Sequence, residues 1–84
     1  MHESSLIPDL IEKITVLAKE NGAQRVTAVD VTIGAMSGID GDHLREHFAA
    51  AATGTLAEGA ELRCRISQDP LSTGVILKSL ELES

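Results

Sequence analysis

The stretch "RVTAVDVTIGAM", residues 25–36, decides the fold of this chain. Its side chains alternate with a period of two, which is typical of a half-buried β-strand. The alternation assigns Thr27, Val29, Val31 and Ile33 to one face and Val26, Ala28, Asp30 and Thr32 to the other. The sequence therefore predicts a strand here, against which the other elements must pack.

An amphipathic helix is predicted ahead of this strand, in residues 5–21. Apolar residues recur there at the i, i+3, i+4, i+7 spacing of one helix face. They are Leu6, Ile7, Leu10, Ile11, Ile14, Leu17 and Ala18. Pro8 is tolerated in a first turn, where backbone N–H groups lack an intrahelical acceptor, so we expect Ser4 or Ser5 to cap the helix. Residues 1–3 would then leave it as a short arm, and Asn21-Gly22 would end it.

A second helix is predicted after the turn-rich segment 36–42. Its sequence, "DHLREHFAAAAT" (42–53), carries Leu44, Phe48, Ala51 and Ala52 on the inward face. Asp40 or Asp42 is the candidate N-cap, and Gly54 ends the helix.

Two further strands are predicted, at 60–67 and 74–84. The first alternates, with Cys64 on the inward face and Arg63 and Arg65 on the outward face. The second changes phase, which either a strand apolar on both faces or a bulge near Lys78-Ser79 would explain.

The order helix–strand–helix–strand–strand predicts a two-layer α+β fold, with residues 1–84 as a single domain. The last two strands are expected to form an antiparallel hairpin across a short break at 68–73. The second helix crosses over from the first strand, which gives a mixed three-stranded sheet with both helices on one face. Its uncovered face would carry Val26, Ala28 and Val75 or Leu77.

Composition excludes several classes of function. The formal net charge is −6 and the pI is near 4.8, with no local cluster of Lys or Arg, which argues against nucleic acid and anionic membranes as partners. No apolar run approaches the ~20 residues of a membrane span, and no signal peptide is recognisable, so a cytoplasmic protein is expected. A single cysteine excludes an internal disulfide and any multi-cysteine metal site.

The first residues, "MHE", bring several potential metal ligands together. The Met1 α-amine and the His2 amide close a five-membered chelate ring, and the His2 amide and Nδ1 close a six-membered one. Such a planar set of nitrogens suits Cu(II) or Ni(II), and Glu3 can add its amide or its carboxylate. A solvated terminal histidine is the alternative reading of so short a motif.

His43 and His47 form a second candidate pair, because residues at i and i+4 are neighbours on a helix. No third ligand is evident, and Leu44 and Phe48 take the inward face. The pair is therefore either a secondary metal site or part of a solvated polar face.

Conventional catalysis finds no support in the sequence. Cys64 reads as a buried structural thiol, and the "DGD" at 40–42 lacks the downstream glutamate of a calcium loop. No glycine-rich phosphate loop and no Ser/His/Asp set is recognisable. The chain is not expected to be an enzyme.

Several stretches together resemble the HypA/HybF family, the nickel-insertion proteins of [NiFe]-hydrogenase maturation. They are "MHE" (1–3), "GAQRVTAVDVTIGAMSGI" (22–39), Leu44 with Phe48, "GTLAEGAELR" (54–63) and "KSLELES" (78–84). The resemblance implies that Met1, His2 and Glu3 form a nickel site. It also implies delivery of nickel to the hydrogenase large-subunit precursor together with a HypB-type GTPase, and in some bacteria to urease.

One departure from the family is large. Its members carry a zinc-ribbon-like insertion with two CxxC pairs between the last two strands, where this chain has only "QDPLST" at 68–73. A structural zinc site takes four ligands, usually Cys or His, so no zinc is expected here.

Three hypotheses follow for the function. The first is a nickel metallochaperone domain whose affinity falls as the pH drops through about 6.5, because imidazole must be neutral to bind a metal. The second is a zinc-less interaction module that docks a partner, or a second copy in a homodimer, through the uncovered face or an edge of the sheet. The third is metal storage or sensing through His43 and His47.

Overall fold

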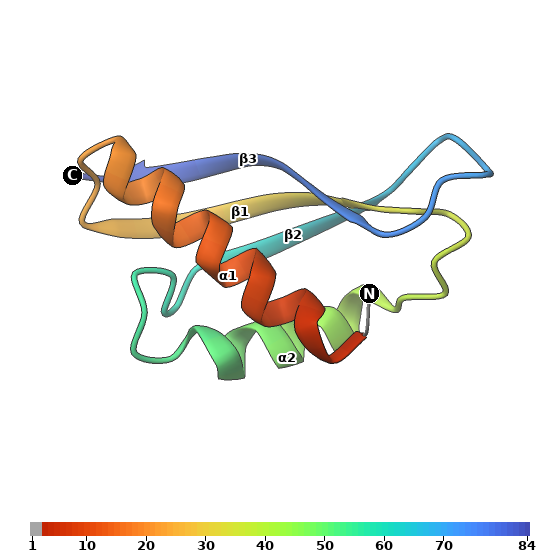
Figure 1. Ribbon diagram of the computed structural model, residues 1–84, viewed down its shortest axis with the longest axis horizontal. Helices are drawn as coiled ribbons and strands as arrows, with labels where there is room; N and C mark the ends of the chain where they lie inside the picture. The colour runs from red at the N-terminus through yellow and green to blue at the C-terminus, as the bar shows by residue number, and fades with distance from the viewer. Residues whose placement is uncertain (1–2) are drawn as a thin grey trace.

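The computed structural model describes residues 3–84 (Figure 1). Its elements run in the predicted order: α1 (Glu3–Glu20), β1 (Arg25–Ile33), α2 (Gly41–Ala52), β2 (Glu61–Ile66) and β3 (Val75–Glu83). Both helices lie on one face of a three-stranded sheet, which confirms the two-layer α+β prediction.

The strands are arranged in the order β2-β1-β3, with β1 parallel to β2 and antiparallel to β3. The mixed sheet is confirmed, but the predicted hairpin between the last two strands is wrong. The central place goes to β1, the one strand of the three that is buried along most of its length. Both later strands bury more apolar surface, and so gain more free energy, by pairing with β1 than by pairing with each other.

The connection from β2 to β3 crosses the end of β1 and is hydrogen-bonded to it. The Ser67 amide donates to the Ile33 carbonyl at 2.8 Å, and the Gly34 amide donates to the Gly74 carbonyl at 2.7 Å. A Cβ on Gly34 would lie 2.5 Å from the backbone of Thr73. Only glycine permits this close approach of the two chain segments.

Two bulges in the paired strands β1 and β3 determine which of their side chains point toward the helices. The register passes from Val26↔Leu82 to Ala28↔Glu81, which leaves Thr27 without a partner and turns Val26 toward the helices. The predicted faces are therefore wrong at these positions: Val26 is fully buried in the core, and Thr27 is exposed. On β3 the unpaired residue is Lys78, so of the two explanations offered for the change of phase the bulge is the one that the structure bears out.

The core fills the space between the helices and the sheet. Phe48 of α2 is its largest fully buried side chain, and it shares the core with Ile14 and Ala18 of α1 and with Val29 and Ile33 of β1. The predicted inward faces of both helices are confirmed at these positions.

The starts of the two helices differ in how well they were predicted. α1 begins at Glu3, so the expected capping by Ser4 or Ser5 is wrong, because both residues lie inside the helix, as does Pro8. Leu6 and Ile7 pack on the core, which extends the helix through the turn before the proline. For α2, Asp40 is the N-cap, and its Oδ1 accepts from the Asp42 amide at 3.1 Å.

Candidate functional site

The predicted nickel arm lies at the start of α1. Met1 and His2 lie outside the described residues, and Glu3 begins the helix. The first backbone N–H groups of an α-helix have no intrahelical acceptor. The amide of Glu3 is therefore not engaged in a helical hydrogen bond.

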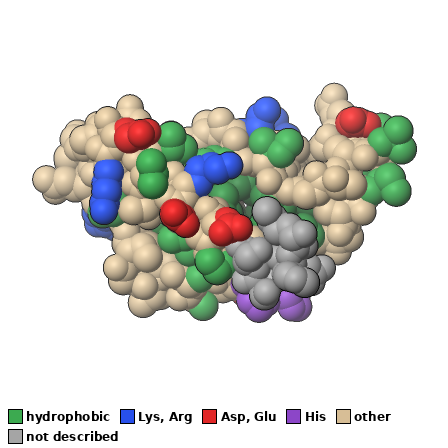
Figure 2. Space-filling model, viewed as in Figure 1, with side chains coloured by type: hydrophobic (Ala, Val, Ile, Leu, Met, Phe, Trp, Pro, Cys, Tyr) green, Lys and Arg blue, Asp and Glu red, His purple; other side chains and the backbone are tan. Residues whose placement is uncertain are grey.

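A groove of about 850 Å³ opens beside this helix start. Leu6, Ile7 and Pro8 of α1 form one wall, and His43 and His47 of α2 form another. The turn before α2 closes one end with Ile39 and Asp40. Figure 2 shows histidine side chains at the lower edge of this face of the molecule. The predicted histidine pair thus lies in one wall of the groove, and the first turns of α1 form the other.

The two histidines of α2 lie side by side at the surface. Their ring centroids are 5.4 Å apart and the ring planes are inclined by 33°. Leu44 and Phe48 point into the core from the same helix, and both histidines are exposed, as predicted. Among the side chains that the structure describes, those of residues 6–84, no group of three or more His, Cys, Asp or Glu is placed to hold a metal ion.

Arg45 holds this stretch of α2 against the sheet. Its Nε donates to the carbonyl oxygen of Leu62 at 3.2 Å, and its guanidinium pairs with Asp42 one turn earlier. The contact joins α2 to β2 and so fixes the orientation of the helix face that carries the histidines.

Cys64 lies half-buried on the helix-facing side of β2, as predicted. Burial raises the pKa of its thiol, and the nearby Arg45 opposes this shift only in part. The Sγ atom lies 4.0 Å from the carbonyl oxygen of Gly41. Because thiolate is the form that binds metals, these surroundings suit a structural thiol.

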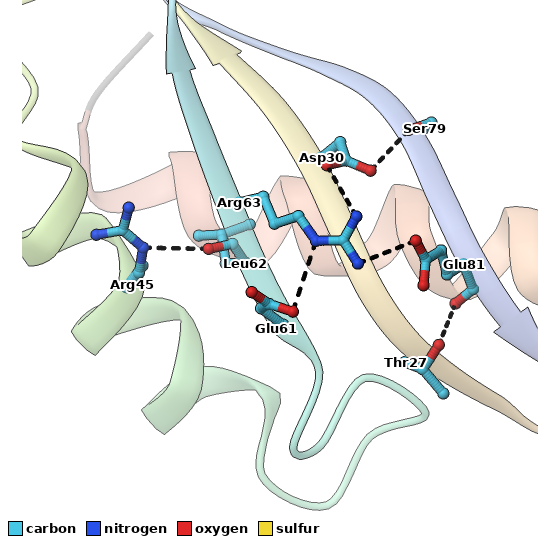
Figure 3. Close-up of polar contacts among 8 residues, drawn as sticks. All are labelled: Thr27, Asp30, Arg45, Glu61, Leu62, Arg63, Ser79 and Glu81. Atoms are coloured by element: carbon cyan, nitrogen blue, oxygen red, sulfur yellow. Dashed lines mark hydrogen bonds and ion pairs between the residues drawn. The ribbon is translucent and has the colours of Figure 1, made fainter.

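The uncovered face of the sheet is not the apolar docking surface predicted from Val26, Ala28 and Val75 or Leu77, because of these only Ala28 lies outside the core cluster. Val75 and Leu77 pack on the core with Val26, because the bulges turn them toward the helices. The open face instead carries Arg63, whose Nη2 donates to Glu81 Oε2 at 2.9 Å (Figure 3).

Further carboxylates complete this ion-pair cluster across the three strands. Asp30 lies 3.6 Å and Glu61 lies 3.5 Å from nitrogen atoms of the Arg63 guanidinium. Ser79 Oγ also donates to Asp30 Oδ2 at 2.8 Å. The hydrogen bond to Glu81, followed by the charges of the three acids, raises the pKa of Arg63 despite some desolvation. The cluster joins the three strands through the side chain of Arg63.

Sequence reasoning missed the groove. Leu6 and Ile7 were assigned to the inward helix face, and they do pack on the core while also lining the groove. Nothing in the pattern around them indicates that the turn at 38–40 closes one end of a cavity.

No helix within residues 3–84 is long and apolar enough to cross a membrane.

Comparison with known proteins identifies the family. A family model described as "Hydrogenase/urease nickel incorporation, metallochaperone, hypA" matches residues 1–72, which include the arm, both helices and two of the strands. The chain belongs to the HypA family. The sequence-based resemblance to HypA/HybF proteins is thereby confirmed.

Individual HypA proteins match closely. The hydrogenase maturation factor HypA of Chlorobium limicola is 47% identical over 62 residues, which are 74% of this chain and 53% of that protein. The HypA of Prosthecochloris aestuarii is 39% identical over 75 residues, covering 89% of this chain and 64% of the relative. The chain thus spans about half to two thirds of the length of these curated relatives.

The fold is also shared with a solved HypA structure. The solution structure of the Ni metallochaperone HypA from Helicobacter pylori superposes with a TM-score of 0.69 at 22% identity. The match covers 100% of this chain and 95% of that chain. At this identity the likeness establishes the fold.

Proposed function

We propose that this chain binds Ni(II) at the arm Met1-His2-Glu3 and delivers it during the maturation of [NiFe]-hydrogenase or of urease. The observation that carries the proposal is that the match to the nickel-incorporation family begins at residue 1 and so includes the arm. The protein acts as a carrier in the cytoplasm and catalyses no reaction of its own.

The arm supplies a planar set of nitrogen ligands. The α-amine of Met1 and the amide and Nδ1 of His2 make three donors in two adjoining chelate rings, and a carboxylate oxygen of Glu3 can take the fourth position. Square-planar nitrogen coordination is favoured by Ni(II), and Cu(II) will compete in vitro because it stands higher in the Irving–Williams order. The Met1 amine must be free for this set to form.

The start of α1 at Glu3 supports this ligand set. Because the Glu3 amide has no helical acceptor, no backbone hydrogen bond has to break when the arm folds around the metal. Ni(II) with the deprotonated His2 amide and the Glu3 carboxylate carries no net charge. The positive end of the helix dipole, about half an elementary charge, therefore does not repel the complex.

Partners and further metals are proposed on the basis of the family. A HypB-type GTPase and the hydrogenase large-subunit precursor are the proposed partners, and the outer edges of β2 and β3 allow a homodimer to form by strand pairing. The single cysteine supports a domain that binds no structural zinc.

The experiment is a titration of the untagged protein with Ni(II), in which calorimetry measures binding and NMR reports on the complex. Square-planar Ni(II) is diamagnetic, so binding at the arm should shift signals without broadening them. His2→Ala, and separately a Gly-Ser extension ahead of Met1, should each abolish this diamagnetic complex. The matched control carries the same Gly-Ser extension after Ser84 and should bind like the parent. Unchanged binding in both arm variants would refute the proposal.

A further inference from the structure

The histidine pair of α2 has the geometry of a chelating metal site. A metal about 2.1 Å from a ring nitrogen lies about 3.2 Å from the ring centroid, so two rings at cis positions have centroids about 4.5 Å apart, and at tetrahedral positions about 5.2 Å. The centroids of His43 and His47 are 5.4 Å apart. Small rotations of two exposed side chains are enough to bring one nitrogen of each ring onto a common ion.

The surroundings of the pair leave both rings available to an ion. No hydrogen bond or ion pair joins either imidazole to another described residue, in contrast to Arg45, which lies between them in sequence. The helix that presents them is held by the burial of Leu44 and Phe48 on the adjacent side of the helix. The two ligands are thus preorganised by a rigid element, which lowers the entropic cost of chelation.

The groove determines what kind of site this is. Its other wall is formed by Leu6, Ile7 and Pro8, whose side chains offer no metal ligand. No third protein ligand is placed among the described residues, and in the site inferred here water fills the remaining positions of a bound ion. Two imidazoles with several waters suit Ni²⁺, Cu²⁺ or Zn²⁺ and make a weak, open site from which a metal exchanges readily.

We infer that His43 and His47 form a second, bidentate site for a divalent transition metal on the rim of the groove where α1 begins. The site takes the hydrated ion, uses one nitrogen of each ring, and is independent of the arm. Its existence does not rest on the proposed function, because neither Met1 nor His2 contributes to it.

The test uses the full-length chain with the arm blocked by His2→Ala and a Gly-Ser extension ahead of Met1. Ni²⁺ alone is the probe, in a buffer that does not bind metals. This parent should bind one Ni²⁺, and octahedral Ni²⁺ is paramagnetic, so the ring signals of His43 and His47 should broaden selectively. Either His43→Ala or His47→Ala should raise the apparent Kd at least about tenfold, as expected when one of two linked ligands is lost.

A matched control keeps the number of histidines and changes only their spacing. His47→Ala combined with Ala49→His places the second ring at an exposed position on another side of α2. This variant should bind as weakly as His47→Ala alone. The substituted positions on α2 are all exposed, and circular dichroism confirms that each variant is folded.

Three results would overturn the inference: no Ni²⁺ binding by the arm-blocked parent, unchanged affinity after loss of either histidine, or full affinity in the spacing control. These outcomes are separate from the fate of the proposed function. Failure of the arm removes the diamagnetic complex of the unblocked protein and leaves the broadening of His43 and His47 intact. Failure of the histidine site does the reverse.

Discussion

The thiol of Cys64 connects packing in the core to the response of the protein to pH. Desolvation raises its pKa in the folded chain above the value in the unfolded chain. A raised pKa means that the folded state favours the protonated thiol. Its contribution to stability is complete below the ordinary thiol pKa and is lost as the pH rises through the raised value.

Alkylation measures this shift directly. At pH 8 the folded protein should react with iodoacetamide several-fold more slowly at Cys64 than the urea-unfolded protein, because both burial and the raised pKa lower the amount of accessible thiolate. Mass spectrometry follows the rate. The control combines Cys64→Ala with Gln68→Cys, at an exposed position, and should react almost as fast folded as unfolded. Equal rates for the two thiols in the folded state would contradict the prediction.

At the scale of single residues, the sequence predicted the burial or exposure of those side chains whose position follows from helix periodicity. The burial of Leu44 and Phe48 places His43 and His47 at the surface, and the structure confirms this. The pairing of Arg63 with Glu81 could not be predicted, because it depends on which strands are neighbours. The roles of Met1 and His2 stay predictions, since these residues lie outside the described part of the chain.

The bulges in β1 and β3 show where strand patterns mislead and where they inform. The alternation in β1 reads as regular, because Val26 is apolar whichever face it occupies, so the bulge at Thr27 leaves no mark in the sequence. In β3 the apolar phase changes at Lys78, and a bulge there was one of the two explanations that the sequence offered. A bulge can be read from a sequence only when it changes the class of residue on a face.

Deletion of Lys78 tests this account of β3. On both sides of this residue the partners on β1 are consecutive, Asp30 with Ser79 and Val31 with Leu77. Its removal should therefore close the ladder with every other pair intact, and the free energy of unfolding in urea should change by less than about 1 kcal/mol.

The control for this deletion removes Glu81 in place of Lys78. Leu82 would then turn to the open face, Glu83 would face the core beside Val26, and the contact of Arg63 with Glu81 would be lost. This variant should be the less stable of the two. Equal loss of stability in both would show that the bulge at Lys78 is required for the fold.

In the molecule as a whole, the groove with its candidate metal ligands lies apart from the connection between β2 and β3, where we expect an insertion to be tolerated best. The groove lies between α1 and α2, whereas the residues between β2 and β3 project from the end of the sheet and include the exposed Leu71 (Figure 1). The fold class, element order and mixed sheet were predictable, because helix and strand periodicities differ. The strand order was not, because adjacency in sequence favours a hairpin that the burial of β1 overrides.

An insertion should be tolerated at this connection. Ten Gly and Ser residues between Gln68 and Asp69 should lower the free energy of unfolding by roughly 1 kcal/mol or less, since loop-closure entropy grows only slowly with length. Ni(II) binding at the arm should be unchanged. Urea unfolding and calorimetry provide the two measurements.

The same insertion between Leu56 and Ala57 serves as its control. Ala57 is fully buried, and the Leu56 carbonyl accepts from the Val26 amide at 2.9 Å, so separating the two residues should cost several times more. A loss of more than about 2 kcal/mol at the first position would show that the connection is itself part of the folding unit.

The central place of β1 has a consequence for how the protein is made. One edge of β1 pairs with residues 61–66 and the other with residues 75–83, which come last in this sequence. During synthesis the edge of β1 that pairs with β3 therefore stays unpaired while some forty residues are added. Strand addition from another protein is a hazard throughout that interval. The nascent chain, more than the finished domain, is thus the form of this protein most in need of a chaperone.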